Sequence, residues 1–261
     1  GKCEKVIPCE IHSGRYVKII ESEIWKNNPY ITMEQKDLQL GRAILMQLNN
    51  PETNYCKMDT HTKAHHRYDK HIIQQICEYY GIDNPELKCD LFFTDKEKEN
   101  VLSIVSGLEE NFITIEPSSK NNYTPNRIYP FDKWQLIVDE LSKDFQIVQI
   151  GNSNSRVLNN VHSLIGKTTF REAALVIGRS KLFLSTEGGL SHAATTTSTP
   201  ALVIITGYQH KKMVAYPQNI NLNIATHGPC GLKIKCPDCI EDANNHDWRE
   251  ICQIVREKIK K

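Results

Sequence analysis

Residues 181–205, KLFLSTEGGLSHAATTTSTPALVII, contain two short apolar runs separated by a glycine turn and a mostly polar segment. The runs 181–185 and 202–205 are typical of buried strands, and a small helix fits the segment that starts near Leu190. A strand, a crossover and a second strand over this length predict a parallel βαβ unit. Because Gly188 and Gly189 can adopt backbone angles closed to other residues, we expect a ligand to approach the main chain here.

The glycine turn also indicates the kind of ligand. A helix beginning near Leu190 would direct its free N–H groups toward the crevice outside the carboxyl ends of the strands, where an anion such as a diphosphate is favoured. Glu187 and His192 flank that place. The alternative is structural, because glycine pairs follow strands in many α/β proteins and His192 can be a partly buried histidine near a helix start.

Length and composition narrow the class of protein. With 261 residues, the chain is long enough for two domains of about 100 to 150 residues each. A net charge of +1 leaves no electrostatic footprint for nucleic acid. Neither a signal peptide nor an apolar run of the roughly 18 to 20 residues that span a bilayer is visible. We therefore expect a cytoplasmic protein whose nine cysteines are mostly reduced.

In the first half of the chain, only short sequence patterns predict secondary structure. Residues 5–11 and 43–48 predict strands, residues 15–25 have loosely helical spacing, and residues 72–80 predict a helix that ends at Gly81. Residues 91–93 predict a strand. The capping box Thr94-x-x-Glu97 predicts the start of a helix that closes the first domain.

In the second half, strands alternate with helices. Strands are expected at 112–115, 145–150, 181–185, 202–205 and 220–224, and helices around Trp134, after the capping box Thr169-x-x-Glu172 and over 247–261. This alternation predicts an α/β fold with a doubly wound parallel sheet. The expected division is an N-terminal α/β domain (1–110), a C-terminal Rossmann-like domain (111–246) and a terminal helix (247–261).

Three stretches in this order resemble glycosyltransferase family 9, the heptosyltransferase-type enzymes. They are ITIEPSS (113–119) followed by RIYPFDKW (127–134), then LIGKTTF (164–170), then TEGGLSH (186–192). The last is similar to the family's Asp-Ser/Thr-Gly-x-x-His signature. In this alignment Thr186 stands at the position of the aspartate and Glu187 at the position of the small hydroxyl residue. The resemblance implies a GT-B-like fold of two Rossmann-like domains with parallel sheets. In such a fold, residues 1–110 would form the acceptor-side domain and residues 111–246 the nucleotide-sugar-binding domain.

The resemblance also implies roles in binding a nucleotide-diphosphate sugar. Ser118 and Ser119 would hydrogen bond the diphosphate, and Arg127 would pair with its charge. Gly188, Gly189 and His192 would hold the same group, and Glu187 would lie near the sugar or the ribose. Transfer then requires no metal, because amides and cationic side chains stabilise the diphosphate leaving group.

The N-terminal region departs from the family pattern. The family opens with a strand and a glycine-rich turn that bears the acidic residue thought to act as base, and the nearest candidates here are Glu10 and His12. The acidic residue expected after Gly151 is also missing, since residues 152–155 are neutral. Three alternatives stay open: an incomplete N-terminal domain, a base elsewhere, or a chain that binds without catalysing.

Four cysteines near the end of the chain form a separate candidate site. Cys236-x-x-Cys239 lies close to Cys230, and Cys252 would be a fourth thiolate. Such a set is compatible with structural zinc or iron, although structural sites with four cysteines usually come as two close pairs. The alternative is a group of reduced structural thiols.

These observations lead to a GT-B-type glycosyltransferase in lipopolysaccharide or glycan biosynthesis. We expect it to move a heptose-like sugar from a nucleotide-diphosphate donor to a saccharide, lipid-linked glycan or protein acceptor. It would work in the bacterial cytoplasm, either free or bound peripherally to the inner membrane. The rival hypotheses are a non-catalytic nucleotide-sugar-binding subunit or pseudoenzyme and an unrelated α/β epimerase or hydrolase.

Overall fold

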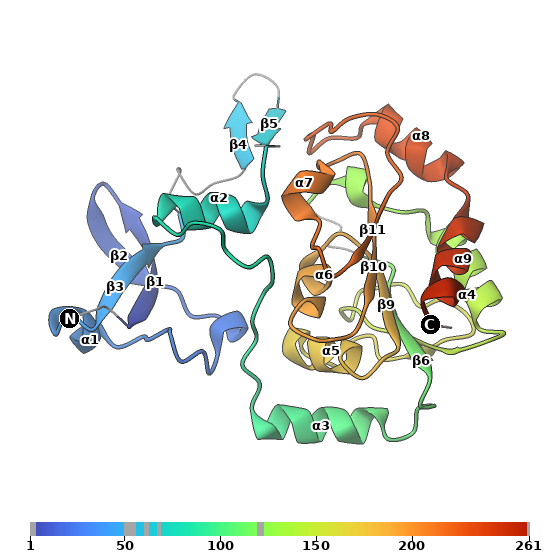
Figure 1. Cartoon of the computed structure of the whole chain (residues 1–261), viewed down its shortest axis with the longest axis horizontal. Helices are drawn as coiled ribbons and strands as arrows, with labels where there is room; N and C mark the ends of the chain where they lie inside the picture. Colours follow the sequence, from blue (N-terminus) through green and yellow to red (C-terminus); the bar gives the residue numbers. More distant parts are fainter. Residues whose placement is uncertain (1–3, 50–55, 60–62, 67–68, 119–122, 260–261) are drawn as a thin grey trace.

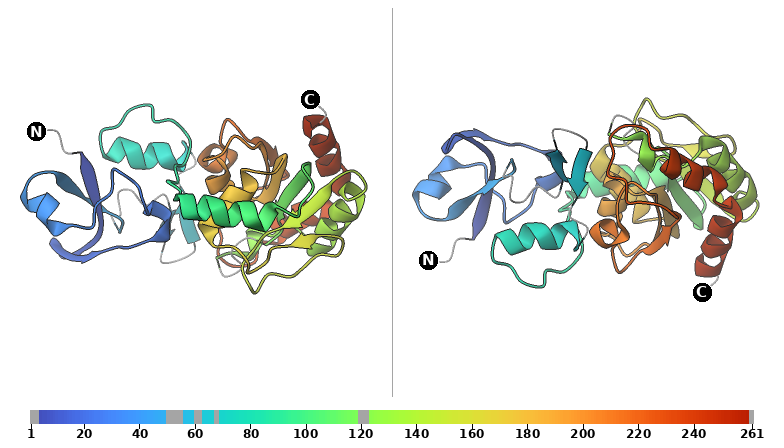
Figure 2. Two further views of the ribbon diagram at one scale, coloured as in Figure 1. Left: turned by 90° about the horizontal axis from the view of Figure 1, so that it is seen from below. Right: turned by 90° about the horizontal axis from the view of Figure 1, so that it is seen from above.

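The computed structural model describes residues 4–49, 56–59, 63–66, 69–118 and 123–259. Its elements form an N-terminal group and a larger C-terminal group that lie side by side (Figure 1 and Figure 2). The C-terminal group contains both large clusters of buried apolar side chains. It therefore provides the scaffold on which the candidate site is built.

The N-terminal group is built on a three-stranded sheet in the order β2-β1-β3. β1 (Lys5–His12) pairs antiparallel with β2 (Arg15–Ile19) and parallel with β3 (Ala43–Gln47). Ser13 and Gly14 both have positive φ angles, 51° and 70°, as tight hairpin turns require. Because this turn returns the chain along β1, the helical prediction for residues 15–25 is wrong, and β2 is followed there by the short 3-10 helix η1 (Glu23–Trp25).

The rest of the N-terminal group is irregular. It contains α1 (Gln35–Gln39), the hairpin of β4 (Cys56–Asp59) with β5 (Lys63–His66), and α2 (Ile72–Tyr79). Residues 91–93 form no strand, so this prediction is wrong. Their backbone is fixed by a side chain instead of a neighbouring strand, because the Phe92 carbonyl accepts a hydrogen bond from Arg171 Nη2 at 2.6 Å.

The C-terminal group contains a six-stranded parallel sheet in the order β11-β10-β9-β6-β7-β8. The strands are β6 (Phe112–Glu116), β7 (Gln146–Gln149), β8 (His162–Ser163), β9 (Leu182–Thr186), β10 (Ala201–Ile205) and β11 (Ile220–Asn223). The chain moves outward from β6 to β8, then crosses to β9 and moves outward to β11. This doubly wound order confirms the predicted α/β, GT-B-like class.

Helices cover both faces of this sheet. On one face, α3 (Asp95–Val105), α5 (Phe170–Ile177), α6 (Gly189–Ala194) and α7 (Lys211–Val214) contribute to one buried cluster. On the other, α4 (Phe131–Leu141), α8 (Pro237–Asn245) and α9 (Trp248–Ile259) contribute to the second. Helix α3 packs against α5, so it belongs to the C-terminal layers although it precedes the expected boundary at 110.

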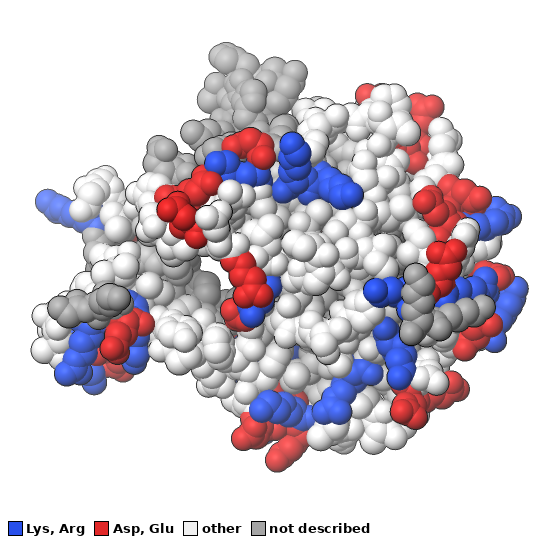
Figure 3. Space-filling model, in the orientation of Figure 1, with Lys and Arg blue, Asp and Glu red and all other residues white. Residues whose placement is uncertain are grey.

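The two capping boxes predicted from the sequence are present. Thr94 and Glu97 cap α3, and Thr169 and Glu172 cap α5, each with both reciprocal hydrogen bonds. On the face shown in Figure 3, basic and acidic side chains alternate and form no single basic surface. Within the described ranges, no helix has both the length and the apolar character needed to span a bilayer.

Candidate donor-binding site

The candidate site lies where the strand order reverses. β6 and β9 are neighbours, yet the chain leaves them toward opposite edges of the sheet. In open α/β sheets, ligands bind in the crevice outside the carboxyl ends of two such strands. The last residue of β6 is Glu116 and the last of β9 is Thr186, so the turn 187–189 borders this crevice.

The glycine turn is ordered by its own helix. Gly188 is the N-cap of α6, its N–H donates to Ser191 Oγ at 3.0 Å, and its carbonyl accepts from the same hydroxyl at 2.8 Å. Gly188 has extended angles, φ −179° and ψ −174°, and Gly189 begins the helix. Gly188 therefore borders the crevice in an extended conformation that other residues can also adopt.

Three side chains predicted from the sequence meet at this turn. Arg127, at the end of the 3-10 helix η2 (Pro125–Arg127), places Nη2 2.5 Å from Glu187 Oε2 and 2.5 Å from the Glu187 carbonyl. His192 Nε2 lies 3.2 Å from Glu187 Oε1. The side chains of Arg127 and Glu187 are 14% and 9% exposed and that of His192 is 29% exposed, so the histidine is the most accessible of the three.

Counting back from His192 corrects one position of the signature. In a six-residue Asp-Ser/Thr-Gly-x-x-His pattern, the acidic residue stands five places before the histidine. That residue is Glu187, whereas Thr186 is a buried strand residue one place earlier. The acidic position is thus occupied by a carboxylate.

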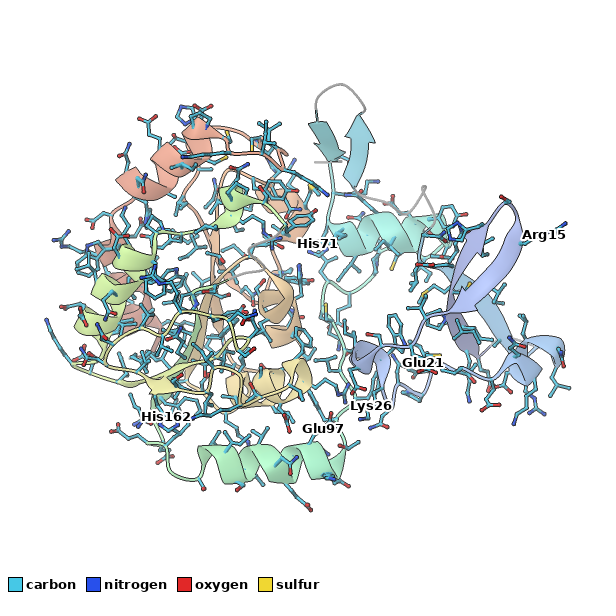
Figure 4. All side chains as sticks on the ribbon, turned by 180° about the vertical axis from the view of Figure 1, so that it is seen from behind. Arg15, Glu21, Lys26, His71, Glu97 and His162 are labelled. Atoms are coloured by element: carbon cyan, nitrogen blue, oxygen red, sulfur yellow. The ribbon has the colours of Figure 1, made fainter. Side chains whose placement is uncertain are left out.

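A second histidine, which the sequence did not single out, approaches from the N-terminal group. Tyr216 OH lies 2.8 Å from His192 Nδ1, and its ring makes an edge contact with His71 at 4.8 Å between centroids. His71 caps α2 through Nδ1 and is 3% exposed (Figure 4). Burial lowers the pKa of His71 to about 4, and the nearby His192 contributes to this shift. His71 is therefore neutral at pH 7 and stabilises the packing of α2 on Tyr216.

The loop that carries Arg127 is held by Asn126, which is 2% exposed. Asn126 Nδ2 donates to the carbonyls of Leu232 and Ile234, both at 2.8 Å, and Oδ1 accepts from Cys236 N–H at 2.8 Å. The position of Arg127 thus depends on a segment more than 100 residues away.

One hydrogen-bond donor of Arg127 is unpaired within the described residues. Its Nε atom is buried and makes no hydrogen bond to the described residues, although Nη2 is paired. The guanidinium lies 5.5 Å from the ring centroid of Tyr123, and Lys233 Nζ lies 5.0 Å from the same centroid. Two cations, Arg127 and Lys233, therefore flank the ring of Tyr123.

A cavity of about 330 Å³ lies next to these residues. It is lined by Glu116, Ser118, Gly151, Asn152, Thr168, Thr169, Phe170, Ala173, Gly189 and Leu190. Of the predicted site residues, Ser118 and Gly189 line this cavity, whereas Ser119 lies outside the described residues. Burial raises the pKa of Glu116 to about 8, although the charge of Arg127 opposes this rise. The sequence analysis missed Glu116, for which the only signal was its place at the end of a predicted strand.

The sulfur atoms of Cys230, Cys236 and Cys239 lie within 4.8 Å of one another. Cys239 Sγ donates to Cys230 Sγ at 3.4 Å, and this hydrogen bond lowers the pKa of Cys230 to about 6. These three cysteines and Cys9, Cys77, Cys89 and Cys252 are free thiols. Cys252 does not join the three, because it lies in α9 within the buried cluster that faces α4.

The candidates for the catalytic base are not brought to the site. Glu10 and His12 lie on β1 near the β1–β2 turn, 3.8 Å apart. His12 pairs with Arg15, which Figure 4 shows on the side of the N-terminal sheet away from the C-terminal group. The hairpin that was missed in the sequence therefore carries both residues away from the crevice.

Comparisons with known proteins agree with this architecture. The family described as glycosyltransferase family 9 (heptosyltransferase) matches residues 57–242. No curated protein sequence matches the chain. Among solved structures, the E. coli ADP-heptose LPS heptosyltransferase II is 14% identical with a TM-score of 0.54, and the comparison covers 69% of this chain and 56% of that one.

Two further solved structures have the same fold. The family 9 glycosyltransferase of Veillonella parvula DSM 2008 is 11% identical, with a TM-score of 0.52 and coverage of 74% and 61%. The iron-containing dodecameric TibC of enterotoxigenic E. coli H10407 is 13% identical, with a TM-score of 0.61 and coverage of 88% and 67%. TibC has also been solved with ADP-D-beta-D-heptose, with the same TM-score. The chain spans only 56% and 61% of the first two proteins.

Proposed function

Because the chain belongs to glycosyltransferase family 9, the heptosyltransferase family, we propose that it binds a nucleotide-diphosphate sugar and transfers the sugar to an acceptor hydroxyl. The observation that carries this proposal is the meeting of Arg127, Glu187 and His192 at the switch point, beside a cavity of about 330 Å³. A heptose-like donor such as ADP-heptose is favoured, since TibC was solved with ADP-D-beta-D-heptose.

The proposed chemistry follows from the charges at the turn. Transfer releases a diphosphate whose developing negative charge must be stabilised. Arg127 offers its unpaired Nε–H, and His192 is the accessible group beside it. Glu187, which holds both side chains, is placed to accept hydrogen bonds from sugar hydroxyls. These cationic groups supply the stabilisation within the protein, so the transfer step itself needs no metal.

The acceptor side is proposed from the packing of the two groups. His71 of α2 faces Tyr216 beside His192, so an acceptor near the site would contact the N-terminal group. A saccharide, a lipid-linked glycan or a protein side chain are the acceptor classes that offer a hydroxyl. A cytoplasmic location, including the surface of the inner membrane, fits a nucleotide-sugar donor of this kind.

A binding-only role is the second candidate, and one observation favours it. Glu10 and His12 lie on the hairpin away from the crevice, so neither can deprotonate an acceptor bound beside His192. A subunit that binds the donor without transferring it requires only the Arg127, Glu187 and His192 cluster. Measuring donor binding and sugar transfer separately distinguishes the two roles.

The test of the donor site is isothermal titration of the full chain with ADP, GDP, UDP and ADP-heptose. We expect Arg127→Ala and His192→Ala each to weaken binding by about 1.5 to 3 kcal/mol, the scale of hydrogen bonds to charged groups. Arg179→Ala and His162→Ala are matched controls, because both side chains are exposed outside the site. Unchanged affinity in both site variants would remove the proposed donor site.

A double variant tests whether the unpaired charge of Glu187 contributes to the loss of diphosphate affinity in Arg127→Ala. Arg127→Ala leaves Glu187 without its cation, so its carboxylate would repel the diphosphate. Adding Glu187→Gln should therefore recover part of the lost affinity. Release of ADP from ADP-heptose in the presence of acceptor would then establish transfer, whereas tight binding without release would favour the binding-only role.

We also propose a structural metal held by Cys230, Cys236 and Cys239. The donor set fits zinc or iron, since three thiols converge and Cys230 readily ionises. Its role would be to stabilise the loop that Asn126 links to Arg127. Metal analysis of freshly purified protein should find about one equivalent, and Cys239→Ser should lose it while Cys77→Ser, outside the cluster, should not. Absence of metal from the wild-type protein would end this proposal.

A further inference from the structure

Glu116 has no role in the donor site as proposed above, yet it lines the cavity next to it. It is the only ionisable side chain among the ten residues that line this cavity. It makes no hydrogen bond to the part of the chain that the structure describes. Buried carboxyl groups are normally hydrogen bonded. Because Glu116 is partly buried and has no hydrogen-bond partner among the described residues, we expect a ligand to supply one.

The position of the cavity indicates which part of the donor it would hold. All ten lining residues belong to the C-terminal group, between the starts of α5 and α6. Arg127 and His192, the proposed diphosphate ligands, do not line it. The transferred sugar must face the acceptor, on the side where His192 contacts Tyr216 and Tyr216 contacts His71 at the start of α2. The nucleoside is then the part of the donor that extends into the cavity.

The cavity wall suits a nucleoside better than a second sugar. Phe170, Ala173 and Leu190 make one part of it apolar, and Phe170 is 39% exposed although it is a large aromatic residue. A planar base can pack on such a ring. The polar part consists of the Glu116 carboxyl, small hydroxyl groups and Asn152, whose Oδ1 already accepts from Asn154 N–H at 2.9 Å.

The Glu116 carboxyl indicates which chemical group of the ligand it would bind. A carboxyl group with both oxygens free can hydrogen bond two neighbouring hydroxyls, and a ribose offers such a pair. Residues 152–155, of which Asn152 lines the cavity, contain no charged side chain that would take this role. We propose that the Glu116 carboxyl binds the ribose hydroxyls of the nucleoside diphosphate, an inference that rests on the proposed donor site.

A contact with the diphosphate is the competing role for Glu116, and it predicts the opposite result. An acidic side chain beside a diphosphate would weaken binding through like-charge repulsion. Burial favours the neutral form of this carboxyl, with its pKa raised to about 8, and a neutral acid can still donate to one hydroxyl and accept from another. Removal of the side chain should therefore lower affinity only for ligands that carry the ribose hydroxyls.

The experiment is isothermal titration of the full chain with ADP and 2′-deoxy-ADP, with the GDP and UDP pairs run alongside. We expect wild type to bind ADP about tenfold more tightly than 2′-deoxy-ADP, because a site built for a hydroxyl rejects a ligand that lacks it. Glu116→Ala should lose more affinity for ADP than for 2′-deoxy-ADP, which offers the carboxyl only its 3′-hydroxyl, so the tenfold preference of wild type should shrink toward one. Glu116→Gln should retain part of the preference.

Glu110→Ala is the matched control, since Glu110 is exposed just before the opposite end of the same strand. Circular dichroism would verify that each variant is folded. An unchanged ratio of the two affinities in Glu116→Ala, or tighter binding of ADP, would overturn this inference and leave the donor site intact. Failure of wild type to bind any of the diphosphates would instead refute the donor site, and this inference with it.

Discussion

Replacing Arg171 with methionine should lower the free energy of unfolding by about 3 to 5 kcal/mol, the usual cost of removing one partner of a buried ion pair. Arg171, in α5, is 1% exposed. Its Nε donates to Glu97 Oε1 at 2.6 Å and its Nη2 donates to Glu97 Oε2 at 3.1 Å. Further hydrogen bonds reach the carbonyls of Phe92, Glu23 and Lys26. Methionine has a similar length but can donate none of these bonds.

The pKa of Glu97 gives a second estimate of the unfolding free energy that the Arg171–Glu97 pair contributes. The hydrogen bond from Arg171 is the largest cause that lowers this pKa from 4.5 to about 2, with Thr94 contributing. A carboxyl shifted by this amount stabilises the folded state by about 3 kcal/mol at pH 7. Because the pKa is lower in the folded state, this stabilisation is complete above pH 4.5. It is lost as the pH falls from 4.5 toward 2.

The assay is urea denaturation followed by circular dichroism, at pH 7 and at pH 3. We expect a large loss in Arg171→Met at pH 7 and a smaller loss at pH 3, where Glu97 protonates once its cation is removed. Glu97→Gln and the double variant complete a cycle, in which the two losses should add to more than the loss of the double variant. Arg179→Met, on an exposed neighbour, is the control. A loss below about 1 kcal/mol at pH 7 would refute the reasoning, since even one unsatisfied buried partner costs more.

Two further predictions concern the supports of the donor site. Tyr216→Phe removes the hydroxyl that lies 2.8 Å from His192 Nδ1, so nucleotide affinity should fall by about 1 kcal/mol in calorimetry. Tyr79→Phe, on an exposed tyrosine, should change nothing, and equal affinities in the two variants would contradict the positioning role. Asn126→Ala leaves the buried Cys236 N–H without its acceptor, so urea denaturation should show a loss of about 1 to 3 kcal/mol. A loss no larger than that of exposed Asn159→Ala would show that water replaces these bonds.

Periodic and capping patterns predicted the C-terminal group well. Both capping boxes and the strands of the βαβ unit are confirmed, because short-range hydrogen bonds and apolar alternation are encoded within a few residues. The N-terminal group was predicted poorly. The strand β2 was read as a helix, since a two-residue turn with positive φ at Ser13 decides the pairing and leaves little trace in periodicity.

Candidate site residues were found where a motif carries them on one turn. Glu187, Gly188, Gly189 and His192 come from a single segment, and the family resemblance added Arg127 and Ser118. The missed residues come from elsewhere in the chain: Glu116 from the end of β6, Tyr216 from the segment after α7, and His71 from α2. No spacing rule connects positions that meet only across a sheet or between two groups of elements.

The sequence by itself determined most strands and helices from residue 112 onward, although not β8, α7 or α8, together with the glycine turn, the cysteine-rich segment and the family. Local hydrogen bonds, apolar periodicity and short motifs act over a few residues, so they can be read directly. Only the tertiary structure decided that β6 and β9 are neighbours, that Arg127 reaches Glu187 across sixty residues, and that Cys252 lies apart from the other thiols. Those distances result from the packing of strands and helices on both faces of one sheet, which depends on the whole core at once.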